Sequence, residues 1–309
     1  MSDSAFEYRA DYMADADSRA AYNRLLKKEW PIPFEDWDRL GLWDGIRPFS
    51  FFCGGEAVAN VSIAEIALIR DGRPCRAVQV GGVIVDPAYR GRGLARELTQ
   101  RAFAACPDDT LFLLYAHNKV YRFYEQFGFA RVAETLFAAD IAAVPPAAGG
   151  ARKLDLDDPA DFELLRDLVQ NRAPVSQRLG VRGGWPLYTF NVLFNDDICA
   201  IGDNVLYIEA LDAAVVCARA PIAGQRRLRL VDVIGRRVPS LDELLPFIVG
   251  EQDREVEFRF TPDSLGCEQR ALEIDGQPAM LDRQRLYARG PFPLDTADAP
   301  FFYPETYLF

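Results

Sequence analysis

Apolar residues in the first half of the chain follow two different spacings. In residues 15–28 and 92–105 they recur every three or four positions, which predicts helices with one buried face. Elsewhere they alternate with polar residues or form short unbroken runs, as expected for strands. A short aromatic-rich helix is expected at residues 118–129, ending at Gly128. The predicted strands are residues 50–55, 57–70, 75–85, 110–116 and 130–139.

The second half of the chain repeats this order of elements without repeating the sequence. Helices are expected at residues 160–170 and 240–250, and the second of them opens on Ser240, a good N-cap residue. The predicted strands are residues 197–201, 205–210, 214–219, 228–234, 255–261, 271–274 and 285–289. Between the halves, residues 144–152 are small, rich in proline and glycine, and without hydrophobic periodicity, as in a linker. The pattern predicts an α/β (α+β) protein with two domains, residues 1–143 and 153–309.

Length and composition narrow the class of protein. A chain of 309 residues with a net charge of −11 fits two globular domains and argues against a general nucleic-acid binder. No apolar run approaches the roughly 18 residues of a membrane span, and the acidic N-terminus has no apolar core of the signal-peptide type. We therefore expect a cytoplasmic protein with no membrane partner. Six scattered cysteines, no CxxC pair and a single histidine speak against a metal site.

The segment with candidate chemistry is residues 83–95, VIVDPAYRGRGLA. An apolar strand ends there, and the turn RGRG at 90–93 leads directly into the next helix. Glycine lets the backbone turn sharply and approach a ligand closely, and the free N–H groups of a helix N-terminus attract anions. Arg90, Arg92 and Arg96 add guanidinium groups that suit phosphate oxygens. This arrangement favours a phosphate or pyrophosphate ligand, and the alternative is a surface turn with solvated arginines.

Two other phosphate-binding motifs do not match this turn. A Walker loop ends in Gly-Lys-Ser or Gly-Lys-Thr, which the chain lacks. A dinucleotide fingerprint has a third glycine where this chain has Arg96. The turn therefore indicates an anion site of another kind.

The wider context of the turn strongly resembles the GNAT superfamily of acetyl-CoA-dependent N-acyltransferases. The resemblance runs from Val83 to Val132: VxVxPxxRGxGxA, an amphipathic helix, an apolar strand, and a short helix with a tyrosine three residues before Phe-Gly-Phe. It implies two tandem GNAT-type mixed sheets flanked by helices, acetyl-CoA as acyl-donor cosubstrate, and no metal. The strand would hold the acetyl and pantetheine arm, and the turn would hold the pyrophosphate. The implied cofactor-binding residues are Val83, Ile84, Val85, Arg90, Gly91, Arg92, Gly93, Leu94, Ala95, Arg96, Asn118 and Tyr121.

The resemblance also implies a catalytic residue. Tyr124 matches the family's tyrosine near the sulfur, where it would act as general acid toward the departing thiolate. A phenol has a pKa of about 10 and keeps its proton at neutral pH, although Tyr124 could instead be a packed aromatic residue. Tyr121, one turn earlier, is expected to pack or to contact the pantetheine arm. His117 could take the place of Asn118, which lies one residue closer to the tyrosine than the family's asparagine does. The alternative for His117 is a hydrogen bond to the backbone at the strand end.

A general base for the acceptor amine is not evident in the sequence. Many members of the family have a glutamate on the strand before the turn, where this chain reads AVQVGG at 77–82, without a carboxylate. Glu65 and Glu29 are the remaining candidates, and a chain of water molecules is the alternative.

The second half lacks a counterpart of the glycine turn. After the strand at 228–234 it reads RRVPS at 236–240, and a proline prevents the same backbone cradle. We expect a degenerate repeat that binds no acetyl-CoA and that shapes the acceptor pocket or forms a homodimer contact. The aromatic tail 301–309 is expected to be docked. Its terminal carboxylate, on Phe309, is a candidate for the active site, as in the enhanced-intracellular-survival aminoglycoside acetyltransferases, which this arrangement resembles.

The expected function is transfer of an acetyl group from acetyl-CoA to a primary amine of a small molecule or peptide, by direct attack in a ternary complex. Tryptophans and acids near the N-terminus lie where the family places its acceptor-binding helices. They suggest an aromatic, acidic pocket for a cationic amine, or simply packing. These residues are Trp30, Trp37, Trp43, Glu35, Asp36 and Asp38. The alternative function is a non-catalytic acyl-CoA-binding regulatory protein, and an alcohol acceptor or a longer acyl chain stays open.

Overall fold

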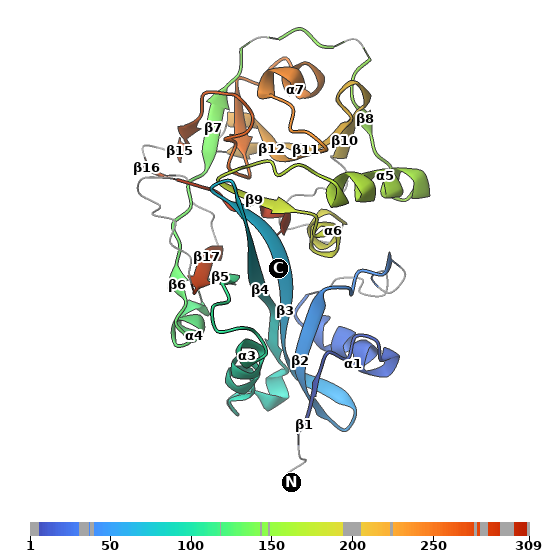
Figure 1. The fold of residues 1–309 in the computed structure, drawn as a ribbon, viewed down its shortest axis with the longest axis vertical. Helices are drawn as coiled ribbons and strands as arrows, with labels where there is room; N and C mark the ends of the chain where they lie inside the picture. Colours follow the sequence, from blue (N-terminus) through green and yellow to red (C-terminus); the bar gives the residue numbers. More distant parts are fainter. Residues whose placement is uncertain are drawn as a thin grey trace.

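The structure is a computed structural model with two β-sheets, one above the other along the long axis of the molecule (Figure 1). It describes residues 6–30, 37, 40–117, 119–142, 144–147, 149–193, 205–222, 225–274, 277–278, 284–290 and 300–307. Both sheets contain parallel and antiparallel pairs, and helices flank them. The predicted α/β (α+β) class with two mixed sheets is confirmed.

The first sheet has helices on both faces. In spatial order its strands are β1 (Glu7–Ala10), β2 (Ile46–Cys53), β3 (Glu56–Arg70), β4 (Arg73–Val85), β5 (Phe112–His117), β17 (Gln284–Arg289) and β6 (Ala130–Arg131), and β9 (Leu179–Arg182) pairs with β3. The helix α1 (Ala16–Leu26) packs with Ile66 and Leu68 on one face. The helices α3 (Leu94–Ala104) and α4 (Tyr121–Glu125) pack with Val78 and Val80 on the other. Alternation along β3 and β4 thus sends apolar side chains to both faces.

The second sheet lies above the first in Figure 1. In spatial order its strands are β14 (Arg270–Ala271), β7 (Phe137–Asp140), β13 (Glu255–Phe258), β12 (Gln225–Gly235), β11 (Ala213–Ile222), β10 (Val205–Ile208) and β8 (Arg152–Lys153). The helix α7 (Leu241–Ile248) covers one face, while α5 (Pro159–Gln170) and α6 (Trp185–Leu193) lie on the side of the first sheet. A separate two-stranded ribbon joins β15 (Glu273–Ile274) and β16 (Gln277–Pro278).

Each of the two sheets contains strands from both sides of the predicted linker. The single strand expected at 130–139 is wrong, because these residues form β6 in the first sheet and β7 in the second. The strand expected at 285–289 in the second half is β17, which lies between β5 and β6 in the first sheet. An alternating sequence predicts which face of a strand is buried, but it does not predict which strand is its neighbour in the sheet. Each sheet is therefore built from both sides of residues 144–152, and a domain division there stays a prediction.

Most other predicted elements are present with shifted ends. The helix expected at 118–129 is shorter, since α4 covers only Tyr121–Glu125. The elements β1, β9 and α6 have no predicted counterpart, and the strand expected at 197–201 lies outside the described residues. Within the described part of the chain, every helix is too short or too polar to cross a membrane.

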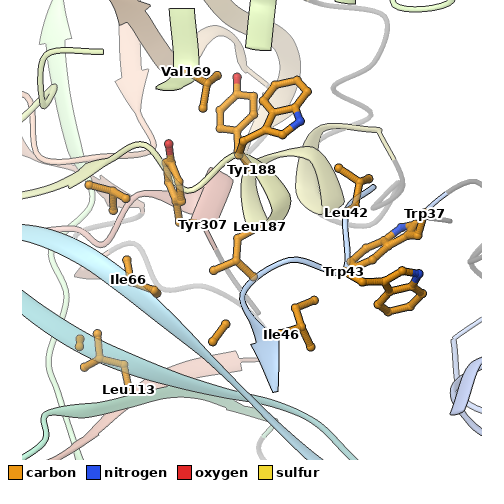
Figure 2. Close-up of a cluster of buried hydrophobic side chains, with 14 of the residues drawn as sticks. Trp37, Leu42, Trp43, Ile46, Ile66, Leu113, Val169, Leu187, Tyr188 and Tyr307 are labelled. Carbon is orange, nitrogen blue, oxygen red and sulfur yellow. The ribbon is translucent and has the colours of Figure 1, made fainter. Parts of the chain in front are cut away.

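The largest apolar cluster lies between the two sheets. Side chains of α1 and β3 meet those of α5 and α6 there, together with residues near the C-terminus. Figure 2 shows Leu187 of α6 on the side of Ile46 and Ile66 of the first sheet, and Tyr188 of the same helix beside Val169 of α5. Because burial of apolar surface is the main driving force of folding, this shared core ties the two sheets into one unit.

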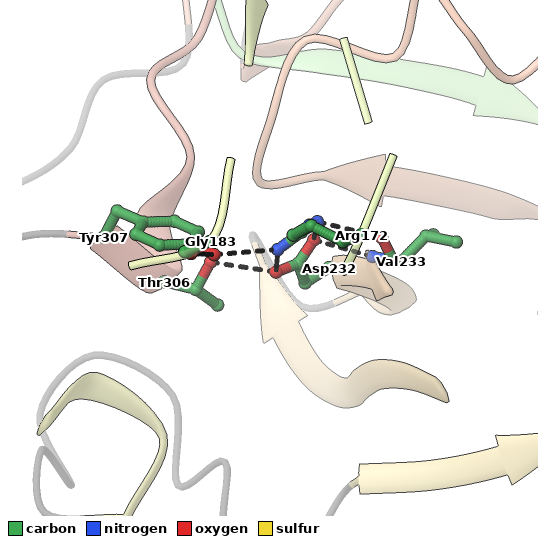
Figure 3. A network of polar contacts seen from close by, with 6 residues as sticks. All are labelled: Arg172, Gly183, Asp232, Val233, Thr306 and Tyr307. Atoms are coloured by element: carbon green, nitrogen blue, oxygen red, sulfur yellow. Dashed lines mark hydrogen bonds and ion pairs between the residues drawn. The ribbon is translucent and has the colours of Figure 1, made fainter. Parts of the chain in front are cut away.

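The C-terminal segment 300–307 is docked in this interface. All residues from Phe301 to Tyr307 are buried, which confirms the expected docking for this part of the tail. Figure 3 shows a polar network at its end, where Arg172 forms an ion pair with Asp232 and donates to the Tyr307 hydroxyl. The carboxylate of Phe309 lies outside the described residues, so its expected role stays a prediction.

Candidate functional site

The turn at 90–93 joins a strand end to an uncapped helix. After β4 the carboxylate of Asp86 accepts a hydrogen bond of 2.9 Å from the N–H of Ala88 and starts a short 3₁₀ turn. Gly91 and Gly93 then both have φ of 78°, a left-handed conformation that only glycine adopts without strain. The helix α3 begins directly after Gly93, with no side-chain hydrogen bond to its first N–H groups. These N–H groups are available to a ligand.

The turn and the first turn of α3 line an open pocket of about 200 Å³. A Cβ atom built on either glycine would meet nothing within 4 Å, so the space in front of the turn is open. The pocket brings together most of the residues predicted from the sequence. Its lining is Val85, Tyr89, Arg90, Gly91, Arg92, Gly93, Leu94, Ala95, Arg96 and Phe123.

Three arginines give this pocket positive charge. The Nε of Arg90 donates to the carbonyl of Val85 over 3.0 Å, which holds its guanidinium beside the strand end. The guanidinium of Arg92 lies 5.4 Å from the ring centroid of Tyr89, and Arg96 is exposed on the first turn of the helix. With the free N–H groups and the helix dipole, these charges suit a phosphate or pyrophosphate.

The strands β4 and β5 part next to this pocket. They pair in parallel only at Val78 with Phe112 and at Gln79 with Leu113, although β4 continues to Val85. On its other side β4 stays paired with β3, with a register shift opposite Gly82. Among the described residues, the edge of Val83–Val85 that faces β5 therefore has no strand partner. That these residues hold an acyl and pantetheine arm stays a prediction.

A buried amide holds the backbone at this register shift. The Nδ2 of Asn60 donates to the carbonyl of Gly82 over 2.7 Å and to the Ser62 hydroxyl over 2.9 Å. Gly82 has φ of 57°, and a Cβ there would lie 3.2 Å from the Asn60 amide nitrogen. Glycine is thus required at this position by both its backbone conformation and the close approach of Asn60.

Tyr124 lies in α4, on the same face of the first sheet as α3. Its ring packs against Phe123 and Phe129 with centroid distances of 5.2 and 6.2 Å, in the cluster that contains α3. Only 9% of the residue is exposed, and burial raises the pKa of its phenol to about 12. The hydroxyl therefore keeps its proton at neutral pH. Tyr121, one turn earlier, stacks on Tyr287 of β17 with ring centroids 6.4 Å apart.

The single histidine is bonded to the backbone. The N–H of Lys119 donates to the Nδ1 of His117 over 3.2 Å at the end of β5. This matches the simpler of the two expectations for His117, a strand-end histidine with a backbone partner. Asn118 lies outside the described residues.

A partly buried carboxyl group that the sequence did not indicate lies on the opposite face of the sheet. Glu134, just after β6, accepts hydrogen bonds from the Tyr115 hydroxyl over 2.6 Å and from the backbone N–H of Tyr303 over 3.1 Å. Burial raises the pKa of this carboxyl from 4.5 to about 7. No local motif marks Glu134, because its partners come from β5 and from the tail. The two bases considered in the sequence, Glu65 and Glu29, are exposed.

The tryptophans near the N-terminus are mostly packed. Trp37 and Trp43 are buried with ring centroids 4.8 Å apart, while Trp30 is 36% exposed. The nearby acids expected to join them, Glu35, Asp36 and Asp38, lie outside the described residues. Among the described residues, no cluster of three or more histidine, cysteine or acidic side chains could hold a metal ion.

The corresponding turn of the second half is occupied by its own side chains. Ser240 and Glu243 form a capping box that satisfies N–H groups at the start of α7. Arg237 pairs with Glu243 over 2.7 Å, and Arg236 pairs with Asp212 over 2.9 Å. This helix end thus differs from that of α3, which has no side-chain cap.

Comparisons with known proteins agree with this geometry. Residues 10–132 match the acetyltransferase (GNAT) domain. No curated protein matches the sequence with significance. A probable N-acyltransferase of Enterococcus faecalis aligns with a TM-score of 0.55 at 15% identity, covering 92% of this chain and 72% of that chain.

Two further structures share the arrangement of both halves. A GCN5-related N-acetyltransferase of Anabaena variabilis aligns with a TM-score of 0.52 at 13% identity, covering 92% of this chain and 72% of that chain. Eis1 of Mycobacterium abscessus aligns with a TM-score of 0.51 at 14% identity, covering 91% and 73%. At such identities the likeness shows the fold alone. Residues 10–132 of this protein thus match the acetyltransferase (GNAT) domain, and 91–92% of the chain shares its fold with these structures.

Proposed function

We propose that the protein is an acetyl-CoA-dependent N-acetyltransferase with a single acyl-donor site in its first half. The observation that carries the proposal is the uncapped N-terminus of α3 behind two left-handed glycines, next to the point where β4 leaves β5. An anion pocket that continues into a free strand edge suits a ligand with a pyrophosphate at one end and an extended acyl arm at the other.

The residues present fit coenzyme A. The N–H groups of Leu94, Ala95 and Arg96 and the arginines of the turn would bind the pyrophosphate, and the free edge of Val83–Val85 would bind the pantetheine arm. Acetyl-CoA would supply a thioester whose carbonyl carbon an amine can attack directly. Tyr124, whose burial raises its pKa to about 12, would donate its proton to the sulfur as the carbon–sulfur bond breaks.

The second half would not bind acetyl-CoA. This part of the proposal is supported by the capping box at Ser240, which already satisfies the N–H groups that a phosphate would need. The half would instead complete the first sheet and cover its acceptor side. The acceptor is proposed to be a primary amine of a small molecule or peptide.

Titration calorimetry with acetyl-CoA tests the donor site. Gly93→Asp places a carboxylate in the pocket and forces a side chain into a left-handed conformation, so we expect at least a tenfold loss of affinity. Gly72→Asp is the matched control, because Gly72 has φ of 73° in an equally open turn remote from the pocket. Equal affinity in both variants would contradict the assignment.

Thiol release in the presence of amines tests the reaction itself. The wild-type protein is expected to release coenzyme A when a polyamine, an aromatic amine or a peptide with a free N-terminus is added. Binding of acetyl-CoA without release by any amine would support a regulatory acyl-CoA-binding protein instead.

A further inference from the structure

Four polar groups meet on the face of the first sheet that is turned away from α3 and α4. Glu134 accepts from the Tyr115 hydroxyl over 2.6 Å and from the Tyr303 N–H over 3.1 Å. The Tyr303 hydroxyl in turn donates to the Oε1 of Gln79 over 3.3 Å. The rings of Tyr115 and Tyr303 pack with centroids 5.9 Å apart. The group thus joins β4, β5, the segment after β6 and the C-terminal tail.

This polar group lies where β4 and β5 separate. Gln79 pairs with Leu113 in the last residue pair between the two strands. Tyr115 lies two residues after Leu113 on β5. Residues on either side of Gln79 point to α3, so Gln79 itself points to the opposite face. The proposed acyl arm runs along the free edge of β4 that begins here, so an acceptor on this face would approach the thioester beside these side chains.

The amide of Gln79 has an unused hydrogen-bonding end. Gln79 is 1% exposed, and its Nε2 has no partner among the described residues. Whichever way the amide is turned, the Tyr303 hydroxyl can serve only one of its two ends. A buried polar group without a partner is destabilising, so this amide points to a ligand bound at the place where the strands part.

We propose that Glu134 removes a proton from the acceptor amine on this face, with Gln79 binding the acceptor beside it. The proposal deepens the proposed acetyl transfer and rests on it. The acceptor enters as an ammonium ion, and one of its protons moves to the Oε2 of Glu134 and then to solvent. The freed lone pair attacks the thioester carbon. Tyr124 gives its proton to the sulfur, and the nitrogen's second proton then passes to the Tyr124 oxygen. The products are the amide and the free thiol.

The surroundings of Glu134 suit a base at neutral pH. Burial raises the pKa of its carboxyl to about 7, while the bonds from Tyr115 and Tyr303 and the charge of Arg285 lower it, and Glu305 raises it. The phenol of Tyr303 is a further titratable group beside Glu134, and burial, Tyr307 and Glu134 raise its pKa. Burial also raises the pKa of Tyr115, which therefore keeps its proton and remains a donor to Glu134. A base is most effective when its pKa lies near the working pH.

The test compares Glu134→Gln with wild type in thiol release from acetyl-CoA, using the panel of amines named above. A glutamine oxygen can still accept from Tyr115 and Tyr303, so the fold and acetyl-CoA affinity should be kept. We expect the rate to fall about 100-fold and its rise through pH 7 to disappear. Glu163→Gln is the matched control, because the side chain of Glu163 on α5 is 54% exposed and the variant is expected to leave rate and pH profile unchanged.

A second variant separates proton transfer from a purely structural role. Tyr115→Phe removes one hydrogen bond to the charged form of Glu134, so the rise in rate should move to higher pH rather than vanish. An unchanged rate and pH profile in Glu134→Gln, with an active wild type, would overturn this proposal alone. A wild type that binds acetyl-CoA and releases no thiol with any amine would overturn the proposed function as well.

Discussion

Replacing Asp232 by alanine should destabilise the whole protein, because it leaves a buried guanidinium without its counter-charge. Asp232 forms an ion pair with Arg172, and each of the two side chains is 1% exposed. Arg172 donates to both carboxylate oxygens and to the carbonyl of Val233 over 2.9 Å. Burial lowers the pKa of Arg172 and the carboxylate of Asp232 raises it. A guanidinium keeps its charge inside a protein even without such a partner. The variant therefore buries an unpaired charge.

The magnitude follows from what is lost. Breaking a buried ion pair by removing one partner costs about 3–5 kcal/mol. The Thr306 hydroxyl also loses its acceptor at 3.0 Å, which costs about 1 kcal/mol more. An exposed pair provides the control: Asp167 pairs with Arg236, and the two side chains are 49% and 52% exposed. Asp167→Ala should therefore change the free energy of unfolding by less than about 1 kcal/mol.

Urea unfolding of both variants at neutral pH gives the comparison. Asp232→Ala should lower the free energy of unfolding by about 4–6 kcal/mol and do so equally at low and high salt, because a buried pair is poorly screened. A loss as small as that of Asp167→Ala would refute the reasoning. It would mean that the Arg172–Asp232 pair contributes little to the stability of the fold, and that the C-terminal segment is held by apolar packing and by its other hydrogen bonds, such as that of the Tyr307 hydroxyl to the Gly183 carbonyl.

Three further results are expected. Glu134→Gln should be more stable than wild type by about 3 kcal/mol at about pH 8 and equal to it at about pH 4. The reason is that the pKa of this carboxyl is raised from 4.5 to about 7 on folding, so its contribution to stability is complete below 4.5 and is lost as pH rises through 7. Parallel curves of stability against pH, measured by urea unfolding, would contradict this. Ser240→Ala should lower the free energy of unfolding by about 1 kcal/mol through loss of the N-cap of α7, and an unchanged urea midpoint would speak against the cap. Tyr124→Phe should bind acetyl-CoA with unchanged affinity in calorimetry but release thiol about 100-fold more slowly; a full rate would remove Tyr124 from the reaction.

The part of the site that could be predicted from the sequence is the part made by neighbours in the chain. The turn at 90–93 is followed directly by its helix, so glycine, arginine and the free N–H groups come together without any long-range contact. Tyr124 could be placed by its spacing from that turn. The alternation of β3 and β4 likewise predicts strands, because side-chain period is a local property.

What the sequence could not reveal depends on pairing between distant segments. The pattern of β17 predicts a strand and does not say that it pairs with β5, more than 150 residues earlier in the chain. From the sequence, Glu134 is expected to be a solvated acid. In the structure, the C-terminal tail places the backbone N–H of Tyr303 beside it. The unused amide of Gln79 is visible only once burial is known.

The C-terminal segment makes the candidate site a property of the whole chain. β17 fills the place between β5 and β6, and without it β5 would present an unpaired edge. Tyr303 donates to Glu134, and Tyr307 receives a hydrogen bond from Arg172 in the second half. A short, buried stretch of chain therefore connects the Arg172–Asp232 pair with the polar group at Gln79. Residues 10–132, which match the acetyltransferase (GNAT) domain, supply the turn, Tyr124, Gln79 and Tyr115. The rest of the chain supplies Glu134 and Tyr303.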